Sequence, residues 1–190
     1  MKVLGIAGSP RHGSNTEILL EQVLEGATSK GAAIGILHIS NLNIMPCSHC
    51  EGCLQGGVCS LIDDMRYVFD EIEQADYVVL AAPIHFMGVP SKVKTLIDRA
   101  QSKWCKKYVL KQPPFDDERK RQGLFVSVCG RTGEHLFEAA EVTVKAFFTS
   151  LNIKYTGKLV FSGIEERTQI RCDATALQAA YTIGEKLVLP

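Results

Sequence analysis

The stretch MPCSHCEGCLQGGVC holds four of the chain's seven cysteines, spaced C-x2-C-x2-C-x5-C at Cys47, Cys50, Cys53 and Cys59. Thiolates this close together are typical ligands of zinc or of an iron–sulfur cluster. The overlapping C-x2-C-x2-C triple lets three thiolates bind three irons of one cubane, and Gly56-Gly57 lets the chain fold back so that the fourth thiolate reaches the fourth iron. Structural zinc sites more often pair two C-x2-C knuckles across a longer spacer. The spacing favours a [4Fe–4S] cluster, with zinc and metal-free thiols as open alternatives.

Length and composition place these cysteines in an ordinary globular protein. The 190 residues suggest one domain, and the hydrophobic fraction is 46%. Basic and acidic residues number 21 each, so the zero net charge predicts neither a nucleic acid nor a membrane as partner. The apolar runs are strand-sized, and the N-terminus does not resemble a signal peptide. We therefore expect a cytoplasmic protein, where a disulfide framework is disfavoured.

Apolar, strand-like runs alternate along the chain with helix-length amphipathic segments. Strands are expected at 2–8, 32–40, 76–83, 123–130 and 153–163. Helices are expected at 15–31, 61–74, 90–104, 134–151 and 173–188, the last weakened by Gly184. The segment 111–122 is expected to be a solvated surface loop. The alternation predicts an α/β fold: a flavodoxin-like, doubly wound, five-stranded parallel sheet in one domain, 1–190, with a cysteine-rich loop at about 43–60 after the second strand.

The first turn between a strand and a helix, GSPRHGSNT, has the composition of an anion cradle. Ligands of open α/β sheets bind beyond the carboxyl ends of the strands, where the next helix offers free N–H groups. The turn lacks the lysine of a nucleotide triphosphatase loop and the G-x-G-x-x-G of a dinucleotide site, so a monophosphate fits best. A simple polar helix cap is the alternative interpretation. The candidate ligands are Ser9, Arg11, Ser14, Asn15 and Thr16.

Two further loops, APIHFMGVPS and CGRTGEH, follow the third and fourth expected strands and reach the same edge of the sheet. The first offers an apolar and aromatic wall at Pro83, Ile84, His85, Phe86, Met87 and Gly88. The second offers a polar rim at Gly130, Arg131 and Gly133, where glycine lets the backbone approach a ligand closely. A phosphate cradle, an apolar wall and a polar rim together suit a flat heteroaromatic ring that carries one phosphate. The natural candidate is FMN.

These three loops resemble those of the NADPH-dependent FMN reductase family of flavodoxin-like proteins. The resemblance implies that the first loop holds the FMN phosphate, while the second contacts the isoalloxazine ring and the third lies on its polar edge. The cysteine stretch resembles the compact motif of the iron–sulfur flavoprotein branch, which implies that Cys47, Cys50, Cys53 and Cys59 bind a [4Fe–4S] cluster that passes electrons to FMN. The resemblance also implies a homodimer or homotetramer. The scattered Cys105, Cys129 and Cys172 are expected to be structural.

The resulting functional hypothesis is an electron-transfer flavoprotein. A ferredoxin-like donor, or NAD(P)H, would supply electrons, and a small acceptor such as O₂, peroxide or a quinone would receive them. No catalytic side chain is named, because the cofactors carry the chemistry. The first alternative is a cluster-free NAD(P)H-dependent FMN or quinone reductase. The second is a zinc-containing flavodoxin-like binding module without turnover.

Overall fold

In residues 1–188, which the computed structural model describes, five strands form one parallel sheet in the order β2-β1-β3-β4-β5. The strands are β1 (Lys2–Ala7), β2 (Ala33–His38), β3 (Tyr77–Ala81), β4 (Arg121–Cys129) and β5 (Ile153–Ser162). In the centre, Val3 of β1 pairs with Ile34 of β2 and Tyr77 of β3. This strand order is the flavodoxin-like one, so the predicted fold class is confirmed.

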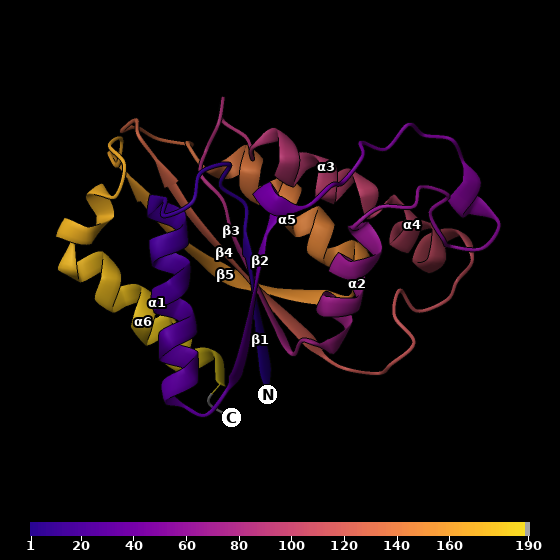
Figure 1. Cartoon of the computed structure of the whole chain (residues 1–190), viewed down its shortest axis with the longest axis horizontal. Coiled ribbons are helices and arrows are strands. Elements are labelled where there is room, and N and C mark those ends of the chain that lie inside the picture. The colour runs from indigo at the N-terminus through magenta and orange to yellow at the C-terminus, as the bar shows by residue number, and fades with distance from the viewer. Residues whose placement is uncertain (189–190) are drawn as a thin grey trace.

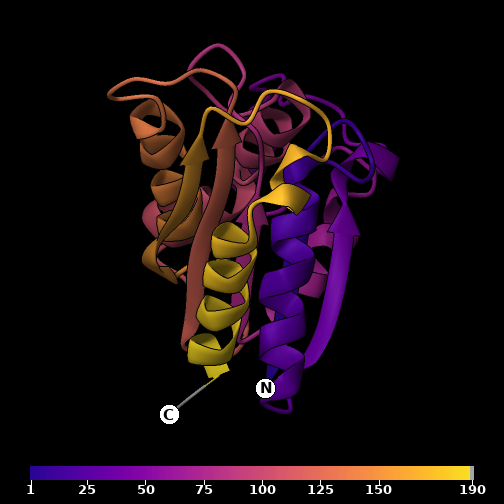
Figure 2. The ribbon, with the colours of Figure 1, turned by 90° about the vertical axis from the view of Figure 1, so that its left-hand side faces the viewer.

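Helices cover both faces of the sheet (Figures 1 and 2). One face carries α1 (Asn15–Ser29) and α6 (Ala174–Val188). The other carries α2 (Met65–Gln74), α3 (Ser91–Arg99), the short α4 (Gln101–Trp104) and α5 (Glu138–Ser150). Each face has its own apolar core, because successive strand residues point in opposite directions: Val3 belongs to the α1–α6 side and Leu4 to the other. Within the described residues, no helix is both long and apolar enough to span a bilayer.

Four single turns complete the chain: η1 (Ile39–Asn41), η2 (Gly52–Leu54), η3 (Cys105–Val109) and η4 (Gln169–Cys172). The helix expected over 90–104 is interrupted at Ala100 and divides into α3 and α4. The helix expected from residue 61 begins only at Met65, because Asp63 and Asp64 bind the segment that leads into the cysteine loop. Their side chains accept the backbone N–H groups of Met45 and Asn43.

Helices α1 and α6 pack through two glycines. A methyl group on Gly26 would lie 2.0 Å from the carbonyl oxygen of Tyr181, and one on Gly184 would lie 2.0 Å from that of Val23. Such a backbone approach excludes any side chain at either position. Gly184 does lower the intrinsic helix propensity of α6, as expected from the sequence, but it is also what allows the helix to pack against α1.

The segment 111–120 is a largely exposed loop, as expected from its composition, but it is anchored at Phe115, and residues 121 and 122 already belong to β4. Phe115 is buried, and its ring is sandwiched between Lys103 Nζ, 4.4 Å from the ring centre, and Arg121 Cζ, 4.6 Å away. Arg121 is itself buried at the start of β4 and pairs with Asp117 Oδ2 at 2.8 Å. The charges that suggested solvation are therefore partly used in packing an aromatic ring.

Candidate functional site

A cavity of about 170 Å³, here called the edge pocket, lies at the carboxyl end of the sheet. It is lined by Ser9, Arg11, Ser14, Asn15, Thr16, Pro83, Ile84, His85, Val128, Gly130, Ile164 and Glu165. The structure thus brings together the whole predicted phosphate cradle, the first half of the predicted apolar wall and one glycine of the predicted rim. The lining comes from the turns that follow β1, β3, β4 and β5.

The cradle is organised around the N-terminus of α1. Ser14 caps the helix, and its Oγ accepts the backbone N–H of Glu17 at 3.3 Å and lies 3.2 Å from Thr16 Oγ1. Ser9 Oγ accepts the backbone N–H of Arg11 at 3.1 Å. The serines and Thr16 are buried, whereas Arg11 is exposed at the rim. Hydroxyl groups, a helix N-terminus and a guanidinium therefore border one small cavity, and this combination favours an anion.

Asn15 uses both ends of its side-chain amide within the protein. Its Nδ2 donates to the carbonyl of Glu166 at 2.8 Å, and its Oδ1 accepts the backbone N–H of Ile170 at 3.1 Å. The residue thereby fixes the loop between β5 and α6 beside the edge pocket. Its direct contact with a phosphate stays a prediction.

The second predicted loop ends in a tight turn. His85 and Gly88 exchange two backbone hydrogen bonds, both 2.9 Å long, which enclose Phe86 at φ +47° and Met87 at φ +65°. Two bulky residues in the left-handed region cost on the order of 1–3 kcal/mol each. The ring of Phe86 points fully into solvent. Phe86, Met87, Gly88, Arg131 and Gly133 are not among the described lining residues of the edge pocket, and their flavin contacts stay predictions.

The sequence interpretation missed three residues of the edge pocket, Val128, Ile164 and Glu165. A methyl group on Gly130 would lie 1.5 Å from Glu165 Oε2, so the carboxylate occupies the space that this glycine leaves open. The loop after β5 carries no glycine-rich or hydroxyl-rich pattern from which its place in the edge pocket could have been predicted. The only available signal was its position beyond the carboxyl end of a strand.

A second cavity of about 260 Å³, here called the cysteine pocket, is lined by all four predicted metal ligands. Its lining is Cys47, His49, Cys50, Glu51, Cys53, Leu54, Cys59, Ser60, Arg99, Gln101, Ser102, Trp104 and Cys105. All seven cysteines of the chain are free thiols. The loop after β2 therefore folds its cysteines toward a common space against α3, α4 and η3.

The thiols are spread around this pocket. Within residues 1–188, no three cysteines have sulfur atoms that all lie within 4.8 Å of one another. Tetrahedral zinc with Zn–S bonds of about 2.3 Å places its sulfur ligands roughly 3.8 Å apart, whereas each thiolate of a four-iron cubane binds a different iron. The donor set thus fits the wider group better than a single zinc ion.

Two thiols of the pocket have shifted pKa values. A hydrogen bond with the Ser60 hydroxyl, whose Oγ is 3.3 Å from Cys50 Sγ, lowers the pKa of Cys50. Burial, and then the hydrogen bond with Cys105, raises the pKa of Cys53 to about 11. The Sγ atoms of Cys53 and Cys105 are 3.5 Å apart. Cys105, expected to be structural, thus belongs to the pocket.

A buried ion pair lies beside the cysteine pocket and contributes one of its members, Arg99, to the lining. The side chains of Arg99 and Asp63 are each 1% exposed, and Arg99 Nη2 donates to Asp63 Oδ1 at 3.0 Å. Burial alone would raise the pKa of Asp63, but the hydrogen bonds from Arg99 and from the backbone N–H groups of Met45 and Met65 hold it below its ordinary value. Arg99 also donates to the carbonyl of Met45 at 2.8 Å.

Arg99 Nε has no hydrogen-bond partner among the described residues, although it is buried. A buried cation with an unused donor beside four thiols matches an anionic, thiolate-bound group. Arg99, Ser102 and Cys105 are spaced three residues apart, so they form a polar stripe on one side of this helical region. That spacing was visible in the sequence, and the structure shows that all three residues are buried. A helix that buries a polar stripe is usually facing something polar.

The sheet order and the pocket at its carboxyl edge define a flavodoxin-like protein, and comparison with known proteins agrees. The chain belongs to the NADPH-dependent FMN reductase family, whose model matches residues 1–165, and to its iron–sulfur flavoprotein branch. The family is one of flavin-dependent oxidoreductases, so the predicted class is confirmed.

Two iron–sulfur flavoproteins of Methanocaldococcus jannaschii illustrate the relationship. One is 33% identical over 150 residues, which cover 78% of this chain and 71% of the relative. The other is 34% identical over 101 residues, 53% of this chain, and the match spans about half of that relative's length, 52%. Among solved structures, the NAD(P)H:quinone oxidoreductase from Methanothermobacter marburgensis superposes with a TM-score of 0.78 at 17% identity, covering 100% of this chain and 97% of that one. This last similarity shows the shared fold.

Proposed function

We propose that this chain is an electron-transfer flavoprotein that carries FMN in the edge pocket and a [4Fe–4S] cluster in the cysteine pocket. Its donor would be a ferredoxin-like protein or NAD(P)H, and its acceptor a small molecule such as O₂, peroxide or a quinone. When bound, the cluster would supply one-electron chemistry and the flavin would couple it to two-electron chemistry. The observation that carries the proposal is the convergence of all four motif cysteines on one cavity, above a buried arginine with a free donor.

In the edge pocket, the protein's part is to bind and orient FMN. The hydroxyls of Ser9 and Ser14, together with the Arg11 guanidinium, would hold the phosphate at the N-terminus of α1. Pro83 and Ile84 offer apolar surface for the ring system. The Glu165 carboxylate is an acceptor for polar N–H or hydroxyl groups of the ligand.

In the cysteine pocket, Cys47, Cys50, Cys53 and Cys59 would hold the cluster. Arg99 would offset the negative charge of the four thiolates and leave its Nε–H for a sulfur atom. Leu54 and Trp104 contribute apolar surface to the lining beside these thiols. These features together favour a bound anionic group over empty thiols.

The edge pocket and the cysteine pocket lie in different parts of the folded molecule. Figure 1 shows the cysteine loop at one end of the molecule, beyond α4, whereas the turn between β1 and α1 lies beside the start of α1. Electron exchange requires the two cofactors to be close. The separation therefore supports the proposed homodimer or homotetramer, in which the cysteine pocket of one subunit would approach the edge pocket of another.

The deciding experiment is an absorption spectrum of anaerobically purified protein, with iron, sulfide, zinc and FMN assayed on the same sample. We expect about four irons and four sulfides per chain together with FMN. FMN without iron would instead indicate the cluster-free NAD(P)H-dependent reductase. Zinc without FMN would indicate the binding module, and a protein without any flavin would refute the proposed use of the edge pocket.

The identity of the donor needs a separate measurement. Anaerobic mixing with reduced ferredoxin or with NAD(P)H, followed at the flavin absorption, compares the two donors directly. Faster reduction by ferredoxin that is lost in Cys53→Ser would support entry of electrons at the cysteine pocket. Equal reduction by NAD(P)H in the wild type and in Cys53→Ser would support direct entry at the flavin.

A further inference from the structure

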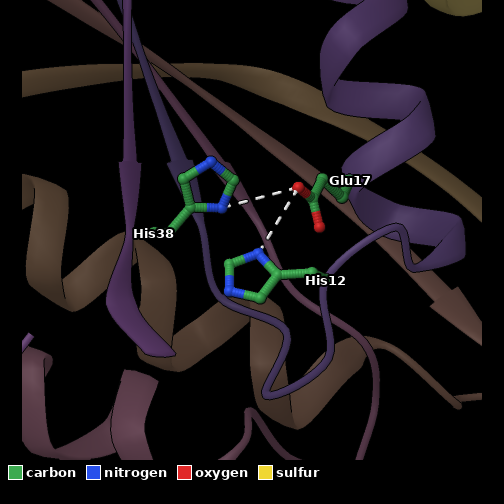
Figure 3. Close-up of side chains that lie close together, drawn as sticks. All are labelled: His12, Glu17 and His38. Carbon is green, nitrogen blue, oxygen red and sulfur yellow. Dashed lines mark ion pairs between the residues drawn. The ribbon is translucent and has the colours of Figure 1, made fainter. Parts of the chain in front are cut away.

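Two histidines and a glutamate converge outside both pockets. His12 lies in the turn between β1 and α1, Glu17 in the first turns of α1, and His38 at the end of β2 (Figure 3). His38 Nδ1 is 3.5 Å and His12 Nδ1 is 4.0 Å from the same oxygen, Glu17 Oε1. In residues 1–188, this is the one group of three or more His, Cys, Asp or Glu residues whose ligand atoms all lie within 4.8 Å of one another.

The spacing of these atoms is close to that of a metal site. Ligands held at about 2.0–2.1 Å from a tetrahedral metal lie roughly 3.3 Å apart. The two distances to Glu17 Oε1 exceed this by less than 1 Å, which small rotations of the side chains can remove. The imidazole rings of His12 and His38 have centroids 5.0 Å apart and are tilted by 51°, so both present a ring nitrogen to the carboxylate without stacking (Figure 3).

The surrounding residues orient this group as outer-shell residues orient metal ligands. His12 Nε2 lies 3.0 Å from Asn41 Oδ1, and the neutral tautomer that donates its Nε2 proton to this oxygen leaves the Nδ1 lone pair free for a metal ion. The backbone N–H of Gly13 binds the other carboxylate oxygen, Glu17 Oε2, at 2.8 Å. Metal-binding histidines typically donate their second ring N–H in this way. A metal cation between this lone pair and the carboxylate oxygen would satisfy both acceptors.

We propose that His12, Glu17 and His38 form a binding site for a divalent transition metal of the Zn²⁺ type. Two imidazoles and one carboxylate are a donor set that such ions take, with one or more positions left open for water or a small oxygen ligand. Glu17 is buried, while the two histidines are partly exposed, so an ion has access from solvent. The site is separate from the cysteine pocket and uses no thiol.

The first test is calorimetric titration of Zn²⁺ into the anaerobically purified holoprotein and into its His38→Gln variant. We expect the variant to bind Zn²⁺ at this site at least about tenfold more weakly. Any zinc that binds at the cysteine pocket does so equally in both proteins and cancels in the comparison. Equal affinity and stoichiometry in the two proteins would overturn the proposal.

The chain offers a matched control. His135 also contacts a carboxylate, with Nδ1 2.6 Å from Glu138 Oε1, and that pair is not part of a three-ligand group in the described residues. His135→Gln should leave Zn²⁺ binding unchanged, and a loss as large as that of His38→Gln would contradict the assignment. The exposed His12→Gln provides a second ligand variant whose folding can be checked by circular dichroism, and it should weaken binding like His38→Gln.

The second test locates the ion. Anomalous X-ray scattering at the zinc edge, from crystals grown with Zn²⁺ alone, should give a peak between His12, Glu17 and His38. Peaks confined to the cysteine pocket or to lattice contacts would overturn the proposal. Asn41→Ala, which removes the acceptor behind His12, should keep the peak and weaken binding by about tenfold, as outer-shell changes do.

Discussion

The edge pocket and the cysteine pocket are built in opposite ways. The edge pocket is made of turns that begin where sheet strands end, so the sheet itself fixes its walls: Gly8 N–H, for example, bonds to the Ala81 carbonyl of the neighbouring strand at 2.7 Å. The cysteine pocket is made largely of a long excursion after β2 whose regular structure is two single turns, η1 and η2. The sheet therefore determines the shape of the edge pocket, whereas the cysteine pocket depends on specific side-chain contacts.

The backbone of the cysteine loop adopts unfavourable conformations on both sides of Cys50. His49 at φ +54° and Glu51 at φ +61° are non-glycine residues in the left-handed region, each next to Cys50. Such conformations persist where the surroundings over-determine them. In our proposal, the bound cluster supplies part of this constraint. We therefore expect the two regions to respond independently to substitutions.

The largest expected effect tests that independence directly. Cys53→Ser should abolish iron binding, because a cubane that loses a thiolate loses one of its four attachments, while FMN content stays near that of the wild type. Iron, sulfide and flavin assays on one anaerobic sample measure both. The exposed Cys172→Ser serves as the matched control and should keep both cofactors. Loss of FMN together with iron in Cys53→Ser would show that the two sites are coupled.

Arg99→Met should have the next largest effect, on stability. The change leaves the Asp63 carboxylate buried without its cation, and breaking a buried pair typically costs about 3–5 kcal/mol. Denaturant unfolding measures the loss of unfolding free energy, and hydrogen exchange locates it. We expect protection to fall first in residues 43–64. A loss of less than about 1 kcal/mol would contradict a supporting role for this pair.

Arg11→Gln should act on the edge pocket alone. A charge-assisted hydrogen bond contributes about 1.5–3 kcal/mol, so FMN should dissociate roughly 10- to 100-fold more readily, with iron content unchanged. Fluorescence titration of the apoprotein with FMN gives the dissociation constant. Arg171→Gln, at another exposed arginine, should bind FMN as the wild type does. Arg131→Gln tests the remaining prediction that this residue touches the flavin.

The smallest expected effect comes from outside both pockets. Hydrogen bonds from Lys145 and then Lys158 lower the pKa of Glu141 to about 2 from an ordinary value of 4.5. This carboxylate therefore contributes stability above about pH 4.5, and the contribution is lost as the pH falls toward 2. Both lysines are well exposed, so the contribution is below about 1 kcal/mol.

Thermal unfolding of Glu141→Gln at neutral pH and at pH 3 measures this contribution. The variant should be slightly less stable than the wild type at neutral pH and should lose less stability on acidification. Glu134→Gln, at an exposed carboxylate, provides the control. An acid response in Glu141→Gln equal to that of the wild type would contradict the assignment and leave the two pockets as the source of acid sensitivity.

The sequence predicted the features that depend on local chemistry. Apolar runs located all five strands, and Ser14 caps α1 where the turn composition indicated. It missed features made by distant segments. Glu165 reaches the edge pocket from the loop after the edge strand β5, and Arg99 meets Asp63 only after the chain has folded. Phe115 was assigned to a solvated loop, because its cationic partners lie in other elements.

The close packing of α1 against α6 at Gly26 and Gly184 has a consequence for the growing chain. The α1 helix leaves the ribosome before residues 174–188 do, yet the surface around Gly26 is complementary to the helix that those residues form. Until α6 is synthesised, this side of α1 lacks its packing partner and exposes apolar surface to other nascent chains. The turn before α1 that forms the anion cradle thus becomes fully supported only once residues 174–188 have been synthesised.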